Sequence, residues 1–154
     1  AKFVRSVRRA PWRLCLSDSQ GKRLSRGKAL ATTVVLARRL RAPWQGQDKV
    51  GLLLPPSIGG ALAAMAASLS GRTAVSLNFT VGQNAFDSAI RQAQLRTVVS
   101  SRAFLDKVKV AIPDGVTLLL LEDVLKDVGT TERLGALARA LLLPLGGLER
   151  ACGA

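Results

Sequence analysis

The sequence predicts an α/β domain with an open, mostly parallel sheet in three layers, in which helices cover both faces. Short apolar runs bounded by turn residues alternate about four times with helical segments, which is typical of an open α/β sheet. The stretch 50–78 reads as strand, tight turn, small-residue helix, glycine stop and second strand. Because such a unit joins parallel strands, it favours a parallel sheet. With 154 residues the chain can bury a core, and we expect a single α/β domain over residues 1–154.

The segment before this unit is expected to form a short helix, a hairpin and a longer helix. Residues 3–10 predict a basic helix, and residues 13–16 a strand. Residues 17–21 have the composition of a hairpin connection. Ser25 is placed to cap the longer helix, which Pro43 ends. That helix carries Leu30, Val34, Ala37 and Leu40 on one stripe, and Arg38, Arg39 and Arg41 near its end, where cations complement the helix dipole.

The strand–helix–strand unit itself is specified residue by residue. Residues 50–54 are apolar on both faces, as an interior parallel strand requires. Ser57 can cap a helix over residues 58–69, whose alanines and glycines let it lie close to a sheet. Gly71 is a natural C-terminal stop, and residues 73–77 predict the second strand.

The second half of the chain repeats the alternation. We expect a helix over 83–94, a strand over 96–100 and a short helix to 108. A turn at 113–115 is followed by a buried strand over 116–121, a short helix over 122–128 and a last helix over 131–143. Ser101 is expected to cap the short helix to 108, and Thr130 or Thr131 the last helix. Pro144 and the Gly146–Gly147 pair then end the helices, so residues 148–154 are expected to form a loop.

Two of these helices have predicted inner faces. For the helix over 83–94 the face consists of Ala85, Phe86, Ala89, Ile90 and Ala93; for the last helix it consists of Leu134, Leu137, Ala138, Leu141 and Leu142.

The charge is strongly positive, with 23 Lys and Arg against 10 Asp and Glu and a net charge of +13. A basic surface could bind nucleic acid, contact anionic lipid, or simply be the surface of an arginine-rich protein. We favour the last reading over nucleic acid, because basic and acidic residues continue to the end of the chain. The small basic binding module for nucleic acid or anionic membrane stays open as the alternative function.

The remaining composition excludes several chemistries. The sequence has no histidine, which removes Ser-His and Cys-His nucleophiles and the common histidine metal sites. Cys15 and Cys152 lie at opposite ends, which suits a reducing, cytoplasmic compartment better than a disulfide framework. Residues 51–71 carry no charge, but prolines and paired glycines divide them into segments too short to span a membrane. We expect no secretory signal, because the opening residues lack the basic, apolar and small-residue pattern of one.

Four segments resemble the AMP-forming acyl-activating synthetases. VGLLLP at residues 50–55 is similar to the strand VAILLPNS of that superfamily, and AVSLN at residues 74–78 to its VVVPLN. GKRLS at residues 21–25 resembles the G..LSYGEL entry segment. Residues 89–105 resemble AIRQAGIRTVLTSRAFLE, which is closest to the acyl-[acyl-carrier-protein] synthetase and 2-acylglycerophosphoethanolamine acyltransferase branch. The resemblance covers residues 13–127; Pro56 and Phe79 depart from its Asn and Pro.

The resemblance implies a parent enzyme that adenylates a carboxylate with ATP and Mg²⁺ and then transfers the acyl group to a thiol. Its implied partners are ATP, a fatty acid, acyl carrier protein or CoA, and a lysophospholipid at the inner face of the membrane. The phosphate loop and the C-terminal domain of that family have no counterpart in these residues. We therefore expect an N-terminal piece that is inactive alone, holds no cofactor or metal, has no catalytic residue, and self-associates through an uncovered sheet edge.

Candidate site residues follow the expected strands. Asn78 is the substrate-binding candidate, because it and Thr80 follow a strand end; a turn is the alternative. Gly59 and Gly60 open a helix and could approach a phosphate, although close packing also explains them. Glu122 and Asp123 could hold Mg²⁺, or could simply favour the dipole at the start of their helix.

For four further residues we prefer a structural explanation to a functional one. Ser100 and Ser101 have no base beside them, so capping explains them better than nucleophilic catalysis. Trp12 and Trp44 could stack on bases, but we expect each to cover an edge of the core.

Overall fold

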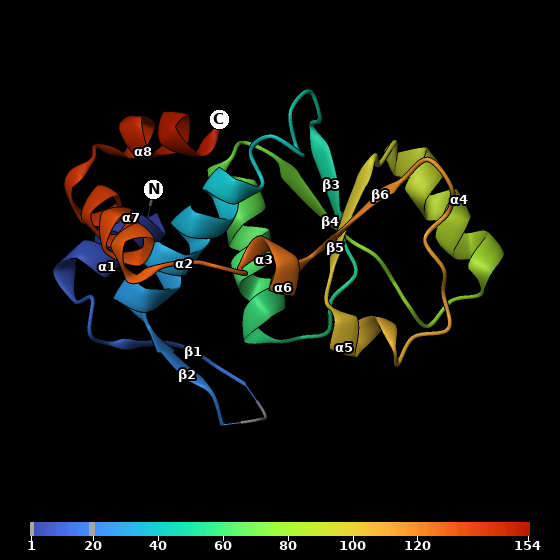
Figure 1. Ribbon diagram of the computed structural model, residues 1–154, viewed down its shortest axis with the longest axis horizontal. Helices are drawn as coiled ribbons and strands as arrows, with labels where there is room; N and C mark the ends of the chain where they lie inside the picture. Colours follow the sequence, from blue (N-terminus) through green and yellow to red (C-terminus); the bar gives the residue numbers. More distant parts are fainter. Residues whose placement is uncertain (1, 19–20) are drawn as a thin grey trace.

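A four-stranded parallel sheet forms the centre of the protein (Figure 1). The computed structural model describes residues 2–18 and 21–154. The strand order is β4 (Thr73–Ser76), β3 (Lys49–Leu52), β5 (Thr97–Ser100) and β6 (Thr117–Leu120). In the register, Val50 lies opposite Ala74 and Gly51 opposite Val98, and every pairing in this sheet is parallel. The predicted parallel sheet is confirmed, with β4 and β6 as its edges.

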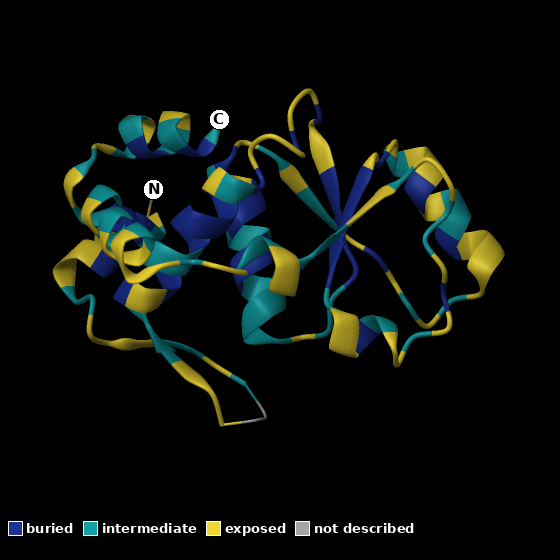
Figure 2. Ribbon diagram, viewed as in Figure 1, coloured by how far each residue is buried: buried dark blue, intermediate teal, exposed yellow. Residues whose placement is uncertain are grey.

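Helices cover both faces of this sheet, which confirms the predicted layers. On the first side of the sheet, α3 (Ile58–Leu69) lies against β3 and β4, α2 (Arg26–Arg39) packs on α3, and α7 (Thr130–Leu142) packs on α2. The helices α1 (Lys2–Arg9), α6 (Leu121–Val124) and α8 (Leu145–Cys152) complete this side and its apolar cluster. The second face carries α4 (Gln83–Ala93) and α5 (Arg102–Leu105). Figure 2 shows buried residues on both sides of the sheet, and two separate apolar clusters correspond to the two faces.

The alternation of side chains along β3 and β5 builds these two cores. Val50 and Leu52 belong to the first core, whereas Leu53 belongs to the second. Neighbouring residues Val98 and Val99 of β5 divide in the same way. This is the expected consequence of side chains that point to opposite faces at successive strand positions.

The βαβ unit follows its sequence signals closely. Ser57 caps α3 with its Oγ, which accepts the N–H of Gly60 at 3.2 Å. The helix ends at Leu69, and Gly71 takes a left-handed φ of +68° just beyond it. Ala63, Ala66 and Ala67 are completely buried, so the small side chains bring α3 close to the elements beneath it.

The N-terminal hairpin is also confirmed. Strand β1 (Leu14–Ser17) pairs antiparallel with β2 (Arg23–Ser25), and the predicted connecting residues 19 and 20 lie outside the described residues. Ser25 caps α2 through an Oγ that accepts the N–H of Lys28 at 3.4 Å. Both caps were predicted from sequence.

The C-terminal segment was predicted wrongly. Residues 148–154 are not a loop, because α8 runs over Leu145–Cys152 and buries Leu148 and Cys152 completely. Pro144 stands at the N-cap of α8, where a residue without an N–H is tolerated and begins a helix as readily as it ends one. Burial of the apolar side offsets the cost of the two glycines within this helix.

The predicted inner face of α7 was partly wrong, although Leu141 does pack against the first core and Leu137 is half-buried. Ala136 and Ala140 are its fully buried residues, whereas Leu134 and Leu142 are exposed, as is Ala138. The helix therefore approaches α2 through its small residues, which allow the closest contact. Gly129 occupies the N-cap, and neither Thr130 nor Thr131 supplies a side-chain cap.

Smaller corrections concern the burial of residues in α4, in β6 and at the two tryptophans. On α4, Phe86 and Ile90 are buried but Ala85 and Ala89 are exposed, so the inner stripe is narrower than predicted. Strand β6 was expected to be buried, yet Thr117 and Leu118 are exposed because β6 is an edge strand. The tryptophans differ from expectation too: Trp12 is 75% exposed, whereas Trp44 is fully buried in the first core.

Cys15 and Cys152 are free thiols, in agreement with the sequence analysis. Burial raises the pKa of the Cys152 thiol to about 11, although Arg38 and Arg41 act against this shift. Within residues 2–18 and 21–154, none of the helices has both the length and the apolar character needed to cross a bilayer.

Packing of α8 leads to a first prediction. Leu148→Ala removes a fully buried side chain of the first core, so we expect it to lower the free energy of unfolding by about 2–5 kcal/mol. The matched control is Leu142→Ala, because Leu142 is 80% exposed and its truncation should change stability by no more than about 0.5 kcal/mol. Urea unfolding followed by circular dichroism measures both, and equal effects would contradict the packing of α8.

Candidate functional site

A cleft of about 610 Å³ lies at the carboxyl ends of β3 and β4. Open α/β sheets bind ligands at this edge, in the crevice beyond the strand ends, and the volume falls in the range of small-molecule sites. The walls come from the ends of β3 and β4, the first turns of α3 and strand β1. They consist of Leu16, Ser17, Leu52, Leu54, Pro55, Pro56, Ser57, Ile58, Gly60, Ala61, Ala64, Ser76, Leu77 and Phe79.

The turn from β3 into α3 lines this cleft, and close packing explains its second glycine, Gly60. A Cβ added to Gly60 would lie 2.9 Å from the carbonyl oxygen of Pro55, which is closer than side chains tolerate. The Gly60 N–H already donates to Ser57 Oγ. The structure therefore gives Gly60 the close-packing role that the sequence analysis offered as the alternative to a phosphate turn.

Asn78 and Thr80 lie next to the cleft and bind each other. Asn78 Oδ1 accepts the Thr80 N–H at 2.9 Å and the Thr80 hydroxyl at 2.8 Å, which is the geometry of an Asx turn. Both residues are exposed, and their neighbours Leu77 and Phe79, not they, line the cleft. The contacts match the turn alternative, and substrate binding by Asn78 stays a prediction.

Glu122 and Asp123 are used by the neighbouring helix α5. Glu122 Oε1 accepts the backbone N–H of Arg102 at 3.1 Å, and Asp123 accepts the Arg102 guanidinium with both oxygens, at 2.6 and 2.8 Å. The bond with Asp123 raises the pKa of Arg102. The acids do stand in the first turn of α6, as predicted, but Glu122 also supplies α5 with the cap that Ser101 does not.

The residues present do not fit a magnesium site. Glu122 accepts the backbone N–H of Arg102, and Asp123 accepts its guanidinium. Within the described part of the chain, no three Asp, Glu, His or Cys side chains gather closely enough to hold a metal ion. Nor is a triphosphate cradle formed at α3, since the Gly60 amide is occupied by Ser57. The residues of the α3 turn therefore line the cleft, and neither they nor the two acids form a site for Mg²⁺ or a triphosphate.

Ser100 has a structural function that sequence reasoning missed. Its side chain is completely buried and its hydroxyl donates to the carbonyl of Leu53 at 2.6 Å, which joins the ends of β5 and β3 beside the cleft. A serine at the end of an otherwise apolar strand was the available signal.

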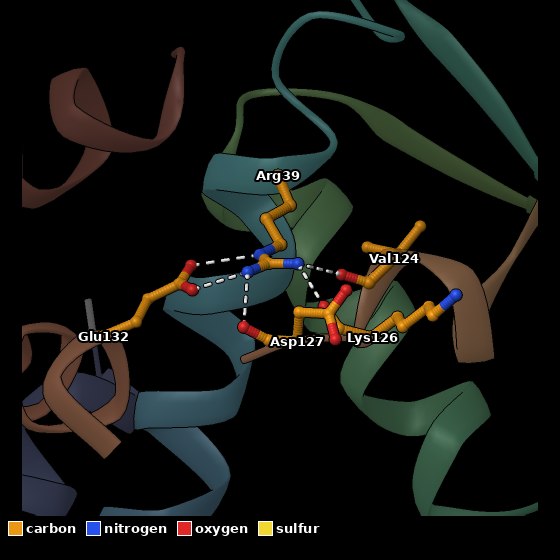
Figure 3. A network of polar contacts seen from close by, with 5 residues as sticks. All are labelled: Arg39, Val124, Lys126, Asp127 and Glu132. Carbon is orange, nitrogen blue, oxygen red and sulfur yellow. Dashed lines mark hydrogen bonds and ion pairs between the residues drawn. The ribbon is translucent and has the colours of Figure 1, made fainter. Parts of the chain in front are cut away.

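A further polar network is centred on Arg39 of α2 (Figure 3). Its guanidinium donates to both carboxylate oxygens of Glu132, at 3.1 and 2.6 Å. It also donates to the backbone carbonyls of Val124 at 3.1 Å, Lys126 at 2.6 Å and Asp127 at 3.5 Å. One side chain therefore joins α2 to the end of α6 and the start of α7. The hydrogen bond with Arg39 holds the pKa of Glu132 below its ordinary value.

No family model matches the chain, but solved structures share its fold. The nonribosomal peptide synthetase FmoA3, bound to α-methyl-L-serine-AMP, aligns with a TM-score of 0.71 and 18% identity over 84% of this chain and 14% of its own. O-succinylbenzoate coenzyme A synthetase from Bacillus subtilis, in complex with ATP and magnesium, aligns with a TM-score of 0.69 and 18% identity over 82% of this chain and 34% of its own.

A fatty acid AMP ligase from Legionella pneumophila aligns with a TM-score of 0.64 and 16% identity over 79% of this chain and 23% of its own. The chain thus spans between 14% and 34% of the length of these three proteins. At these identities the likeness establishes the fold alone. The four-stranded parallel sheet with flanking helices is that of the N-terminal subdomain of the AMP-ligase fold.

The two glycines of the α3 turn should respond differently to substitution. Gly60→Ala places a Cβ against the Pro55 carbonyl, so we expect the free energy of unfolding to fall by about 1–3 kcal/mol. Gly59→Ala is the matched control, because its Cβ would meet only the end of the Leu121 side chain at 3.3 Å, and alanine should stabilise the helix by about 0.4–1 kcal/mol. Thermal unfolding of both variants tests the opposite signs.

The Arg39–Glu132 pair should make the free energy of unfolding fall at acidic pH. Since the pKa of Glu132 is lowered on folding, its contribution is complete above the ordinary glutamate pKa of about 4.3 and is lost as the pH falls through the lower folded value. We expect Glu132→Gln to lower the urea midpoint at pH 7 and the gap from the wild type to close below about pH 4.

Arg39→Gln should produce a larger gap that closes only in part, because this change also removes the donors to the carbonyls of Val124, Lys126 and Asp127. The double variant should lose less than the two single variants together, because both changes remove one interaction. If the difference in urea midpoint between the wild type and Glu132→Gln did not change with pH, the assignment of Glu132 would be contradicted.

Proposed function

We propose that this chain is the N-terminal α/β portion, over residues 1–154, of an ATP-dependent acyl-activating enzyme. The observation that carries the proposal is that two independent signals coincide. The segments that resemble the AMP-forming synthetases are the strands and helices of the βαβ unit and of its neighbour, and the fold they form is shared with adenylating enzymes. The parent would be the enzyme, and this portion alone would be inactive.

In the reaction proposed for the parent, a carboxylate oxygen attacks the α-phosphate of ATP. A bond forms between that oxygen and the α-phosphorus, and the bond between the α-phosphorus and the oxygen that bridges the α- and β-phosphates breaks. Pyrophosphate leaves, and acyl-AMP is formed. A thiol then attacks the acyl carbon, loses its proton and displaces AMP. Mg²⁺ would neutralise charge on the phosphates.

The residues of this chain would contact the carboxylic acid substrate and not the phosphates. Leu54, Ile58 and Phe79 give the cleft an apolar wall that excludes water, and the Pro55–Ser57 turn fixes its shape. The phosphate loop, the metal ligands and the catalytic lysine would belong to other parts of the parent.

The finer assignment is to the fatty acid branch, with acyl carrier protein or CoA as the thiol acceptor and a lysophospholipid as a further acyl acceptor. The wording of residues 89–105 supports it, as does the fatty acid AMP ligase among the structural neighbours. Asn78 is retained as a substrate-binding candidate at the rim of the cleft. The cytoplasm is the proposed location, and β4 and β6 are the edges through which the isolated chain would self-associate.

The isolated chain should neither adenylate carboxylates nor bind ATP at micromolar concentration. Isothermal titration calorimetry with ATP and Mg²⁺, and ATP–pyrophosphate exchange in the presence of fatty acids, measure the two activities. Micromolar binding of ATP would contradict the proposal, because the polar groups at the strand ends are already paired.

The proposal is tested directly on the longer polypeptide. Its reading frame should continue past Ala154 into a Gly-, Ser- and Thr-rich loop ending in lysine, within about 30 residues. That protein should catalyse pyrophosphate exchange that depends on a fatty acid. Ala61→Leu, which fills the cleft, should raise the KM for the acid, while Ala89→Leu on the exposed side of α4 serves as the control.

A further inference from the structure

One end of the molecule combines exposed apolar side chains with exposed arginines. Leu142 at the end of α7 is 80% exposed and Trp12, in the turn after α1, is 75% exposed. Arg5 and Arg9 of α1 and the adjacent Arg13 are exposed as well. We call these five residues the α1–α7 end.

Hydrogen bonds hold the parts of the α1–α7 end together. The guanidinium of Arg8 donates to the carbonyl of Ala140 at 3.2 Å and to that of Leu143, so the last turn of α1 is fixed against the end of α7. The Arg13 N–H then donates to the carbonyl of Ala10 at 3.2 Å, which closes the turn that carries Trp12. Figure 1 shows α1 and α7 at the same end of the molecule, and Figure 2 shows exposed residues on both helices.

The electrostatic character of this end is positive. Asp18 is the only acidic residue among residues 1–47 of the sequence, and Glu149 of α8 lies beside α1, in the hollow lined by Phe3 and Val4. Among the described residues, the two side-chain ion pairs lie elsewhere, at Arg39 and Arg102. The three arginines of the α1–α7 end are therefore available to an anionic partner.

We propose that the α1–α7 end docks on an anionic lipid bilayer. Trp12 and Leu142 would enter the interface between headgroups and acyl chains, and Arg5, Arg9 and Arg13 would bind lipid phosphates. The contact is a docked surface, not an inserted helix, because the apolar side of α1 is used inside the protein, where Val4 and Val7 are buried.

The apolar residues favour a bilayer over nucleic acid. An indole can stack on a base, but an exposed leucine finds no apolar partner along a phosphate backbone, whereas both side chains gain from the membrane interface. The inference is independent of the proposed function, because none of the five residues lines the cleft.

Tryptophan fluorescence measures this docking at the residue concerned. The chain has two tryptophans, and Trp44 is fully buried, so a change in emission on adding vesicles reports Trp12. Vesicles of phosphatidylglycerol and phosphatidylcholine should shift the emission to shorter wavelength, and pure phosphatidylcholine should shift it much less. Trp12→Phe should abolish the shift while circular dichroism remains unchanged. The binding should weaken at least tenfold between about 50 and 500 mM NaCl.

Variants separate the two parts of the surface. Leu142→Ser should lower the vesicle partition coefficient about tenfold, and the triple variant Arg5→Gln, Arg9→Gln, Arg13→Gln should abolish the preference for anionic lipid. Leu134→Ser is the matched control, since Leu134 is an exposed leucine on the same helix outside the α1–α7 end.

Three results would overturn the proposal: no shift with anionic vesicles, equal effects of Leu142→Ser and Leu134→Ser, or binding to duplex DNA that exceeds vesicle binding and is insensitive to Leu142→Ser. Arg8 is left unchanged in all variants because it holds α1 in place.

Discussion

The pairing of β3 with a parallel neighbour on each side determines how the remaining chain is arranged. A strand in this position presents both faces to protein, and its alternating residues demand apolar partners above and below. Val50 and Leu52 meet the α2 and α3 side, whereas Leu53 meets the α4 side. The same pairing aligns the carboxyl ends of the strands, so the loops after β3 and β4 come together and form the cleft. The position of the candidate site is thus a consequence of strand direction.

A second constraint explains part of the positive charge. The last carbonyls of a helix have no partner within it, and an arginine offers five N–H donors in a rigid fork. Arg8 donates to carbonyls at the end of α7, and Arg39 to those after α6. Arg72 donates to Ser70 and Gly153, the residues that end α3 and α8, and also to Trp44. These guanidiniums join elements far apart in sequence. The structure therefore supports the reading of an arginine-rich protein, in which part of the excess charge is structural, while the α1–α7 end keeps its arginines exposed.

The sequence predicted those parts of the fold whose signals are local. Ser57, the apolar run before it and Gly71 define α3 to the residue, because a cap, a small-residue stripe and a left-handed stop act within a few positions. What failed depended on tertiary contacts. Whether Pro144 ends one helix or begins another was decided by the burial of Leu148 and Cys152, and the choice of Ala136 over Leu134 as the inner residue of α7 by how closely it approaches α2. In the candidate site, strand ends were predictable, but the bonds from Arg102 to Glu122 and Asp123 were not, since they join residues 20 and 21 positions apart.

The residues that line the cleft form a surface that is already in place without a ligand. Several polar groups at and beside the cleft are paired within the protein: Gly60 with Ser57, Ser100 with Leu53, and Asn78 with Thr80. Such groups hold the backbone in place without offering a free donor or acceptor for chemistry, and the surfaces between them are apolar. An enzyme that forms a reactive mixed anhydride needs surfaces of this kind, because a rigid, water-excluding wall protects the intermediate while charged groups elsewhere act on the phosphates. Under the proposed function, the same paired groups would leave catalysis to other parts of the parent, and these residues would shape the substrate's side of a shared site.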